Sequence, residues 1–231
     1  MRLCVFAGVC FCFASAAAQK PSYDAPTVLA TINDRSISES SGLVASRTTA
    51  GAYWTHNDSG DGPFIYALDT RGESFGTFRV SGAQAFDWED IAAGPGPQPN
   101  KSYLYIGDIG DNDAKRPEVT VYRVAEPVLP AATRKFTKAR PGTTEPAEAI
   151  RLKYPDGAHD AEALLVDPAT GNIYIVIKVL IASPIVYEAA APFTAGHVIT
   201  MRRIGEIHVP SLFGGVITGG SVSPDGRRVA L

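Results

Sequence analysis

A short acidic motif occurs three times in this chain, and each copy leads into a short aliphatic run. The copies are Glu39-Ser-Ser-Gly-Leu43, Asp87-Trp-Glu-Asp-Ile91 and Asp160-Ala-Glu-Ala-Leu164. When repeated units are arranged around an axis, their equivalent positions converge, so repeated acids can build one shared site. This repeat limits the possible folds more than any other feature of the sequence.

The rest of the chain is patterned as β-structure. Runs rich in Val, Ile, Tyr and Phe are bounded by Gly, Pro, Asn and Asp, and no window has convincing helical spacing of apolar residues. The runs group into three units of four, at 42–43, 52–55, 64–68 and 75–80; at 89–92, 103–106, 119–124 and 149–154; and at 162–166, 173–177, 185–188 and 203–209. Four strands joined by short turns are typical of a β-propeller blade. A generic β-sandwich is the alternative.

Two segments depart from this regular pattern. Residues 126–148, rich in Pro, Thr and Ala, interrupt the second unit and predict an exposed loop. A fourth unit begins at Ser223-Pro-Asp-Gly226, and one strand follows it. We expect residues 19–231 to form an all-β domain, a β-propeller of four-stranded antiparallel blades. Propellers close with about 4–8 blades, so we expect this one to be an incomplete fragment of about three and a half blades, truncated at the C-terminus.

Residues 1–18 predict a secretory signal peptide. Arg2 precedes an apolar run over 3–13, and Ala16-Ala17-Ala18 provides a cleavage signal. A buried first helix is the alternative. The apolar run is shorter than the about 20 residues that span a bilayer, so we expect a periplasmic or secreted protein with no membrane span in the mature chain. The net charge of −3 without a Lys/Arg cluster disfavours nucleic acid as a partner.

The acidic pairs of the repeat predict a metal site. Side chains alternate along a strand, so Asp87 shares a face with Glu89, and Asp160 shares one with Glu162. Glu39 occupies the matching position in the first unit. The first strand of each propeller blade lines the central channel, and Ca²⁺ prefers about 6–8 oxygen ligands, so we expect these five acids to bind Ca²⁺. The alternatives are acids that cap turns within their own units, or a metal-free acid/base site.

Two acidic turns offer further candidate ligands. Residues 57–62 and 108–113 follow the second strand of the first and second units. They contain Asp58, Asp108 and Asp111, which we expect to be weaker candidates for binding Ca²⁺. The alternative is ordinary Asx and glycine turn chemistry.

Several strings resemble those of known propellers. Ser223-Pro-Asp-Gly226, followed by a basic-aliphatic strand, resembles the blade motif of TolB-type propellers. Four further strings are similar to those of a largely uncharacterised group of exported bacterial propellers, at 54–60, 87–92, 107–112 and 156–164. The resemblance implies the fold and export but no particular activity. Gly219-Gly220-Ser221 departs from the acidic pattern, so any ring of acids is incomplete here.

Two classes of function follow from these features. The first is an exported propeller with an acidic Ca²⁺-binding channel that binds a small molecule or a protein on its loop face. The alternative is a metal-dependent hydrolase of phosphoesters or lactones, as in phytase-like or lactonase-like propellers, with Glu89, Glu162 and His159 as candidate catalytic residues. In either case we expect Glu89 and Glu162 to face one another across the channel, with His159 near its mouth.

Overall fold

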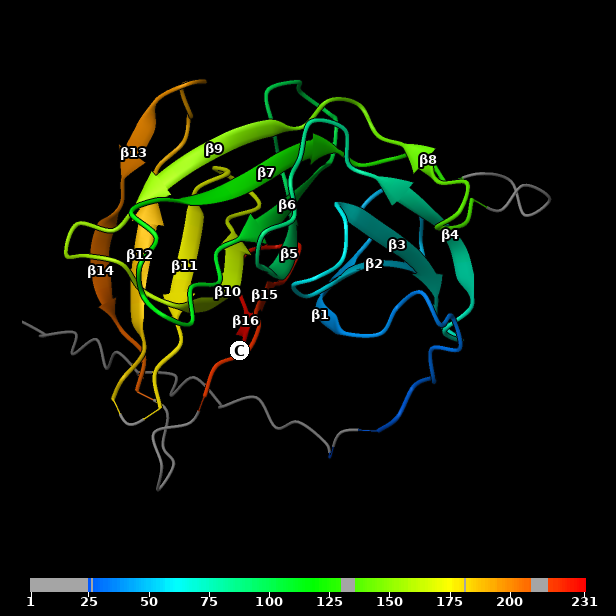
Figure 1. The fold of residues 1–231 in the computed structure, drawn as a ribbon, viewed down its shortest axis with the longest axis horizontal. Coiled ribbons are helices and arrows are strands. Elements are labelled where there is room, and N and C mark those ends of the chain that lie inside the picture. Colours follow the sequence, from blue (N-terminus) through cyan, green and yellow to red (C-terminus); the bar gives the residue numbers. More distant parts are fainter. Residues whose placement is uncertain (1–24, 26, 130–135, 181, 209–215) are drawn as a thin grey trace, which may run out of the picture.

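The computed structural model describes residues 25, 27–129, 136–180, 182–208 and 216–231, and the predicted signal peptide lies outside these residues. The described residues form sixteen strands in four sheets and no helix (Figure 1). None of them therefore forms a helix long and apolar enough to cross a membrane. The all-β prediction is confirmed.

Three antiparallel meanders correspond to the three predicted units, and the expected strands are confirmed, except that the strand expected over 203–209 ends at Glu206 and residue 209 lies outside the described residues. The first sheet contains β1 (Ser40–Ala45), β2 (Ala52–Asn57), β3 (Phe64–Asp69) and β4 (Ser74–Arg79). The second sheet contains β5 (Trp88–Gly94), β6 (Tyr103–Asp108), β7 (Val119–Ala125) and β9 (Glu148–Lys153). The third sheet contains β10 (Ala161–Val166), β11 (Ile173–Ile177), β12 (Ile185–Ala189) and β14 (Arg202–Glu206).

Two short strands extend these sheets with parallel pairing. Strand β8 (Gly142–Thr143) pairs with β4, and β13 (Val198–Thr200) pairs with β9. The predicted exposed loop over 126–148 was therefore wrong for part of its described length, because β8 joins the first sheet and Phe136 packs against its core. A two-residue strand is too short to show alternation in the sequence, so the pattern could not reveal it.

The first strands of the sheets lie next to one another near the middle of the molecule. Strand β5 lies between β1 and β10, and β15 (Ser221–Val222) lies beside β10. The remaining strands of each sheet extend outward from these positions (Figure 1). Strand β15 pairs with β16 (Val229–Ala230) in the fourth sheet, and none of the described sheets closes on itself. The acidic motifs are thereby brought to one central region.

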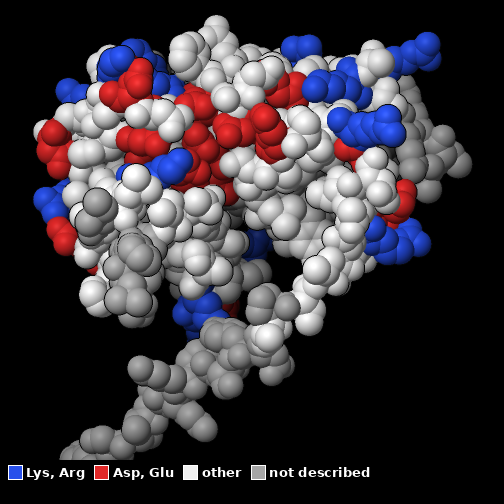
Figure 2. Space-filling view, turned by 60° about the horizontal axis from the view of Figure 1, so that its bottom comes forward, with Lys and Arg blue, Asp and Glu red and all other residues white. Residues whose placement is uncertain are grey.

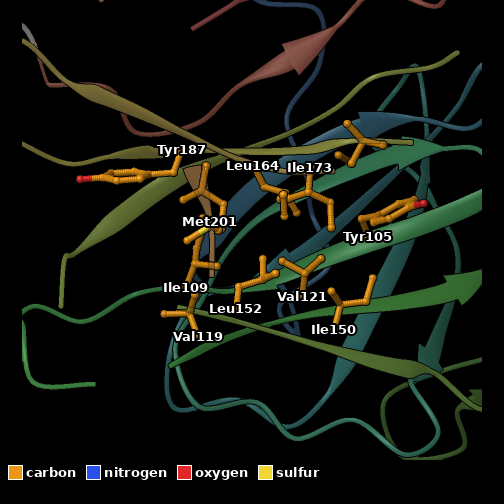
Figure 3. Close-up of a cluster of buried hydrophobic side chains, with 14 of the residues drawn as sticks. Tyr105, Ile109, Val119, Val121, Ile150, Leu152, Leu164, Ile173, Tyr187 and Met201 are labelled. Atoms are coloured by element: carbon orange, nitrogen blue, oxygen red, sulfur yellow. The ribbon is translucent and has the colours of Figure 1, made fainter. Parts of the chain in front are cut away.

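Both faces of the second sheet are buried. Trp54, Phe78 and Trp88 fill the core toward the first sheet. On the other face, aliphatic side chains of the second and third sheets pack together (Figure 3), among them Val121, Ile150, Leu164 and Ile173. The alternating pattern of strand residues accounts for two separate cores on one sheet.

Candidate acidic metal site

A β-bulge occurs at the same position in the three first strands. In β5 the register shift leaves Glu89 without a paired residue in β6, and in β10 it leaves Glu162 without one in β11. The shift in β1 includes Ser41. A bulge turns a side chain away from the regular alternation and is frequent beside functional sites. Glu89 and Glu162 are therefore equivalent residues, and Ser41 lies in the corresponding bulge.

The first acid of each motif is equivalent as well. The backbone carbonyls of Glu39, Asp87 and Asp160 each accept a hydrogen bond from a residue just beyond the second strand of their own sheet, with N···O distances of 2.9, 3.2 and 2.9 Å. The donors are Asp58, Gly110 and Lys178, respectively. Asp58, Gly110 and Lys178 therefore occupy equivalent positions in the three sheets but have very different side chains.

One group of three acids comes together at the start of β5. Ligand oxygens of Asp58, Asp87 and Glu89, which we call the acidic triad, all lie within 4.8 Å of one another. Glu89 is 3% exposed, whereas Asp58 and Asp87 are half-buried. The molecule also carries a band of acidic side chains across one face (Figure 2).

The triad carboxylates repel one another, and the positive charges of Arg116, near Asp87, and Lys178, near Glu89, compensate them only in part. Burial, followed by the negative charges of Glu162, Asp58, Asp87 and Asp160, raises the pKa of Glu89 to about 9. Burial and neighbouring carboxylates also raise the pKa of Asp87. Among the described residues, no hydrogen-bond donor or cation contacts the Glu89 carboxyl group, so a proton or an added cation must neutralise it.

Gly110 lets the triad carboxylates lie directly against its backbone. A Cβ atom at this position would lie 2.3 Å from Oε1 of Glu89 and 2.4 Å from Oδ2 of Asp87. Any side chain there would collide with the carboxylates. The second sheet therefore contributes no side chain at the position where the third sheet places Lys178.

The corresponding acids of the third sheet share one countercharge. The amine of Lys178 donates a hydrogen bond to Glu162 and lies 3.9 Å from Oδ2 of Asp160. The other carboxylate oxygen of Asp160 accepts the backbone N–H of Asp111 at 2.8 Å. Hydrogen bonding to Glu162 raises the pKa of Lys178, so this lysine acts as an internal cation for the pair.

The other candidate ligands have local partners or lie elsewhere. Asp108 accepts the backbone N–H groups of Phe86 and Asp87 and pairs with Arg116 at 2.8 Å. Asp111 accepts the backbone N–H of Arg116 at 2.6 Å. Both therefore act as turn residues. Glu39 is exposed and is not part of the triad, and its position in the site is taken by Asp58.

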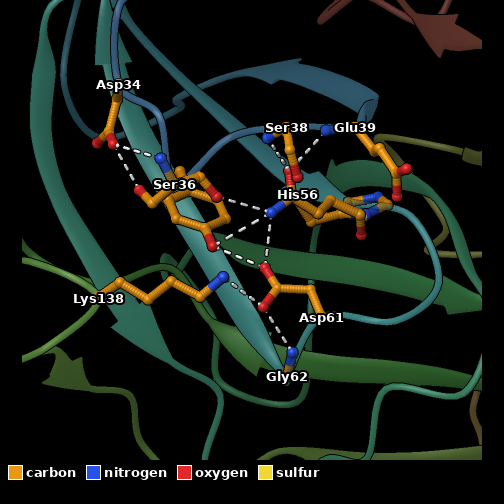
Figure 4. A network of polar contacts seen from close by, with 10 residues as sticks. Asp34, Ser36, Ser38, Glu39, His56, Asp61, Gly62 and Lys138 are labelled. Atoms are coloured by element: carbon orange, nitrogen blue, oxygen red, sulfur yellow. Dashed lines mark hydrogen bonds and ion pairs between the residues drawn. The ribbon is translucent and has the colours of Figure 1, made fainter.

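The turn that carries Asp58 is held by side-chain hydrogen bonds (Figure 4). Asn57 donates to Asp61, which also accepts from the Tyr66 hydroxyl group and pairs with Lys138 at 2.6 Å. The side chains of this turn, expected as a possible Ca²⁺ loop, therefore hold one another. Asp58 is the residue of this turn that belongs to the acidic triad.

The candidate His159 and a second histidine, His56, have separate environments. Nε2 of His159 lies 3.0 Å from a carboxylate oxygen of Asp156 and 3.2 Å from the Tyr187 hydroxyl group. His56 is fully buried, its Nδ1 lies 2.8 Å from the carbonyl of Asn57, and burial lowers its pKa. Neither histidine belongs to the acidic triad.

The sequence analysis did not single out Asp90, the second acid of β5. Asp90 is 1% exposed, and its carboxylate accepts the backbone N–H groups of Ile91, Leu164 and Gly220 at 2.8, 2.9 and 3.0 Å. Burial raises its pKa to about 7, although these three bonds favour the charged form. Asp90 thereby joins β5 to β10 and to the segment before β15. The sequence feature related to Asp90 is Gly42 of β1, which lies against it in space. A Cβ atom at Gly42 would lie 2.7 Å from Oδ1 of Asp90.

No protein-family model, no curated protein and no solved structure matches this chain. The similarity to TolB-type and exported bacterial propellers therefore stays a hypothesis that rests on the motifs.

Proposed function

We propose that this chain is an exported β-propeller whose acidic triad binds a divalent cation, with Ca²⁺ preferred, and that it serves as a module for binding a small molecule or a protein on the loop face. The observation that carries the proposal is the triad, with ligand oxygens within 4.8 Å and a buried, unpaired Glu89. Isolated acidic clusters are common, but a buried carboxyl group without a partner requires compensation.

The propeller part of the proposal is supported by the arrangement of the three meanders. Their first strands are neighbours, their bulges coincide, and their acids occupy equivalent positions. Sheets related in this way are the units from which a ring of blades is assembled. Export is proposed from the predicted signal peptide over 1–18.

The geometry and chemistry of the triad suit a hard cation. Ca²⁺ binds oxygens at about 2.3–2.6 Å, so ligand oxygens on opposite sides of the ion lie about 5 Å apart, and the triad fits within one coordination sphere. Three carboxylates offer up to six oxygens, and the triad contains no thiolate or imidazole that would favour softer metals. Ion binding would displace the proton from Glu89.

Binding is proposed over hydrolysis because the expected catalytic groups are engaged. A hydrolase needs a base within hydrogen-bond reach of the attacking water. His159 interacts with Asp156 and Tyr187, and Glu162 is paired with Lys178. Glu89, the remaining candidate, is itself a member of the triad.

Calorimetric titration of the full chain with CaCl₂, after chelation, tests this proposal. We expect binding and a higher melting temperature, because a ligand of the native state stabilises it by about 2.7 kcal/mol at 100 times its Kd. Glu89→Gln should weaken binding at least about tenfold, because a charged ligand is lost.

The matched control is Glu73→Gln, which removes an exposed carboxylate from a turn outside the triad. It should bind Ca²⁺ as the unmodified chain does. Absence of any calorimetric or thermal response to Ca²⁺ in the unmodified chain would reject the proposal, as would equal binding by the two variants.

A further inference from the structure

A second candidate site lies at the opposite end of β5 from the acidic triad. A cleft of about 630 Å³ opens between the second and third sheets. It is lined by the segment after β5 (95–97), the β10–β11 turn (169–171) and the segment after β12 (191–195). Small-molecule sites are typically clefts of about 300–1,000 Å³ with apolar walls and a few polar groups.

The polar groups of this cleft come from one row across the second sheet. Tyr105 is paired directly with Arg123, and Arg123 with Glu148, so the three side chains share the face that packs toward the third sheet. Arg123 is only 8% exposed. Its guanidinium carbon lies 5.9 Å from the centre of the Tyr105 ring and 5.4 Å from that of Phe193.

The ion pair in this row retains hydrogen-bonding capacity. Nε and Nη2 of Arg123 both donate to Oε2 of Glu148, at 3.2 and 2.5 Å. A guanidinium group carries five N–H donors, and a carboxylate has a second oxygen, so these bonds and a further one between Arg123 and Tyr105 leave donors on Arg123 and Oε1 of Glu148 for other partners. The cleft thus presents a donor and an acceptor side by side.

This combination selects the charge and the chemistry of a ligand. An anion that approaches Arg123 also meets the negative charge of Glu148, and a cation that approaches Glu148 meets Arg123. Neighbouring hydroxyl groups satisfy both, because one can accept from the guanidinium while the other donates to the carboxylate. Pro95, Pro97 and Phe193 provide apolar walls for C–H surface. We propose that this cleft binds a neutral mono- or disaccharide, independently of the acidic triad.

Saturation-transfer NMR and calorimetry on the full chain test the proposal. The probes are glucose, galactose, mannose, N-acetylglucosamine and cellobiose, with glucuronate and glucosamine as charged analogues. We expect at least one neutral sugar to bind, and its charged counterpart to bind at least about tenfold more weakly, as expected for one unfavourable charge contact. No binding by any neutral sugar, or equal binding by glucuronate, would overturn the proposal.

Glu148→Gln sharpens the test because it keeps the shape of the side chain and removes its charge. This variant should weaken binding of the neutral sugar and strengthen binding of glucuronate. Glu118→Gln is the matched control, since Glu118 pairs with Arg151 at 2.6 Å on the same sheet but does not line the cleft.

Phe193→Ala removes the ring beside Arg123 and should also weaken sugar binding, while both members of the Arg123–Glu148 pair are kept. Melting curves establish that each variant is folded. Unchanged sugar affinity in folded Glu148→Gln and Phe193→Ala variants would contradict the assignment of the cleft.

Discussion

The second and third sheets carry the same Asp-x-Glu motif on the same bulge, yet the two pairs have opposite electrostatic surroundings. In the third sheet, Lys178 neutralises Glu162 and lies near Asp160. In the second sheet, the equivalent position is Gly110, and the neighbouring first sheet adds Asp58 instead. A repeated motif therefore does not define a repeated site, because the residue just beyond the second strand determines its charge balance.

The largest expected effect is on the pH dependence of stability when Ca²⁺ is absent. The folded-state pKa of Glu89 is raised from an ordinary value near 4.5 to about 9. Its contribution to stability is therefore fully present below about pH 4.5 and is lost as pH rises through about 9, with a slope of at most about 1.4 kcal/mol per pH unit.

Urea unfolding across this pH range, with a chelator, measures the effect. Glu89→Gln should flatten the profile relative to the unmodified chain, and Ca²⁺ should flatten it as well. A profile that is identical in the variant and the unmodified chain would show that Glu89 titrates normally.

Removal of the internal cation of the third sheet should be the next largest effect. Lys178→Met leaves Glu162 and Asp160 without their countercharge, so we expect a loss of about 1–3 kcal/mol in the free energy of unfolding at neutral pH, reduced from the buried-pair value because Lys178 is partly exposed. Lys153→Met, at an exposed position of β9, is the control. Similar losses for both variants would contradict the countercharge role.

A steric change at the equivalent position of the second sheet should act on the triad. Gly110→Ala places a Cβ atom against Glu89 and Asp87, so we expect about 1–3 kcal/mol of destabilisation and weaker Ca²⁺ binding. Gly205→Ala is the matched control, because nothing lies within 4 Å of a Cβ atom there. Unfolding curves and Ca²⁺ titrations compare the two; unimpaired binding in Gly110→Ala would argue against the triad as the binding site.

The smallest expected effect comes from a variant that gives the pair Asp87 and Glu89 a countercharge like that of the pair Asp160 and Glu162. Asp58→Lys should place a cation from the first sheet beside Asp87 and Glu89, so we expect about 1 kcal/mol of stabilisation in chelator and no thermal response to Ca²⁺. Asp113→Lys, in an exposed turn outside the triad, is the control and should keep the response. Retained Ca²⁺ stabilisation in Asp58→Lys would break the comparison between the two sheets.

Much of the fold was predictable because the signals that specify it are local. Alternation and turn residues located the strands of the three meanders, and the spacing of the motifs identified Asp87 with Asp160 and Glu89 with Glu162. Strand β8 was not predictable, since a two-residue strand depends on the sheet edge that it joins rather than on its own pattern.

The composition of the site was decided by contacts between sheets. The sequence supplied Glu89 and Asp87 as an acidic pair, but only the tertiary structure brought Asp58 to them, kept Glu39 outside and placed Lys178 against Glu162. Sequence periodicity specifies which face of its own strand a side chain occupies. The pKa of that side chain and its capacity to bind an ion depend on burial and on charges contributed by other strands, which no local sequence pattern specifies.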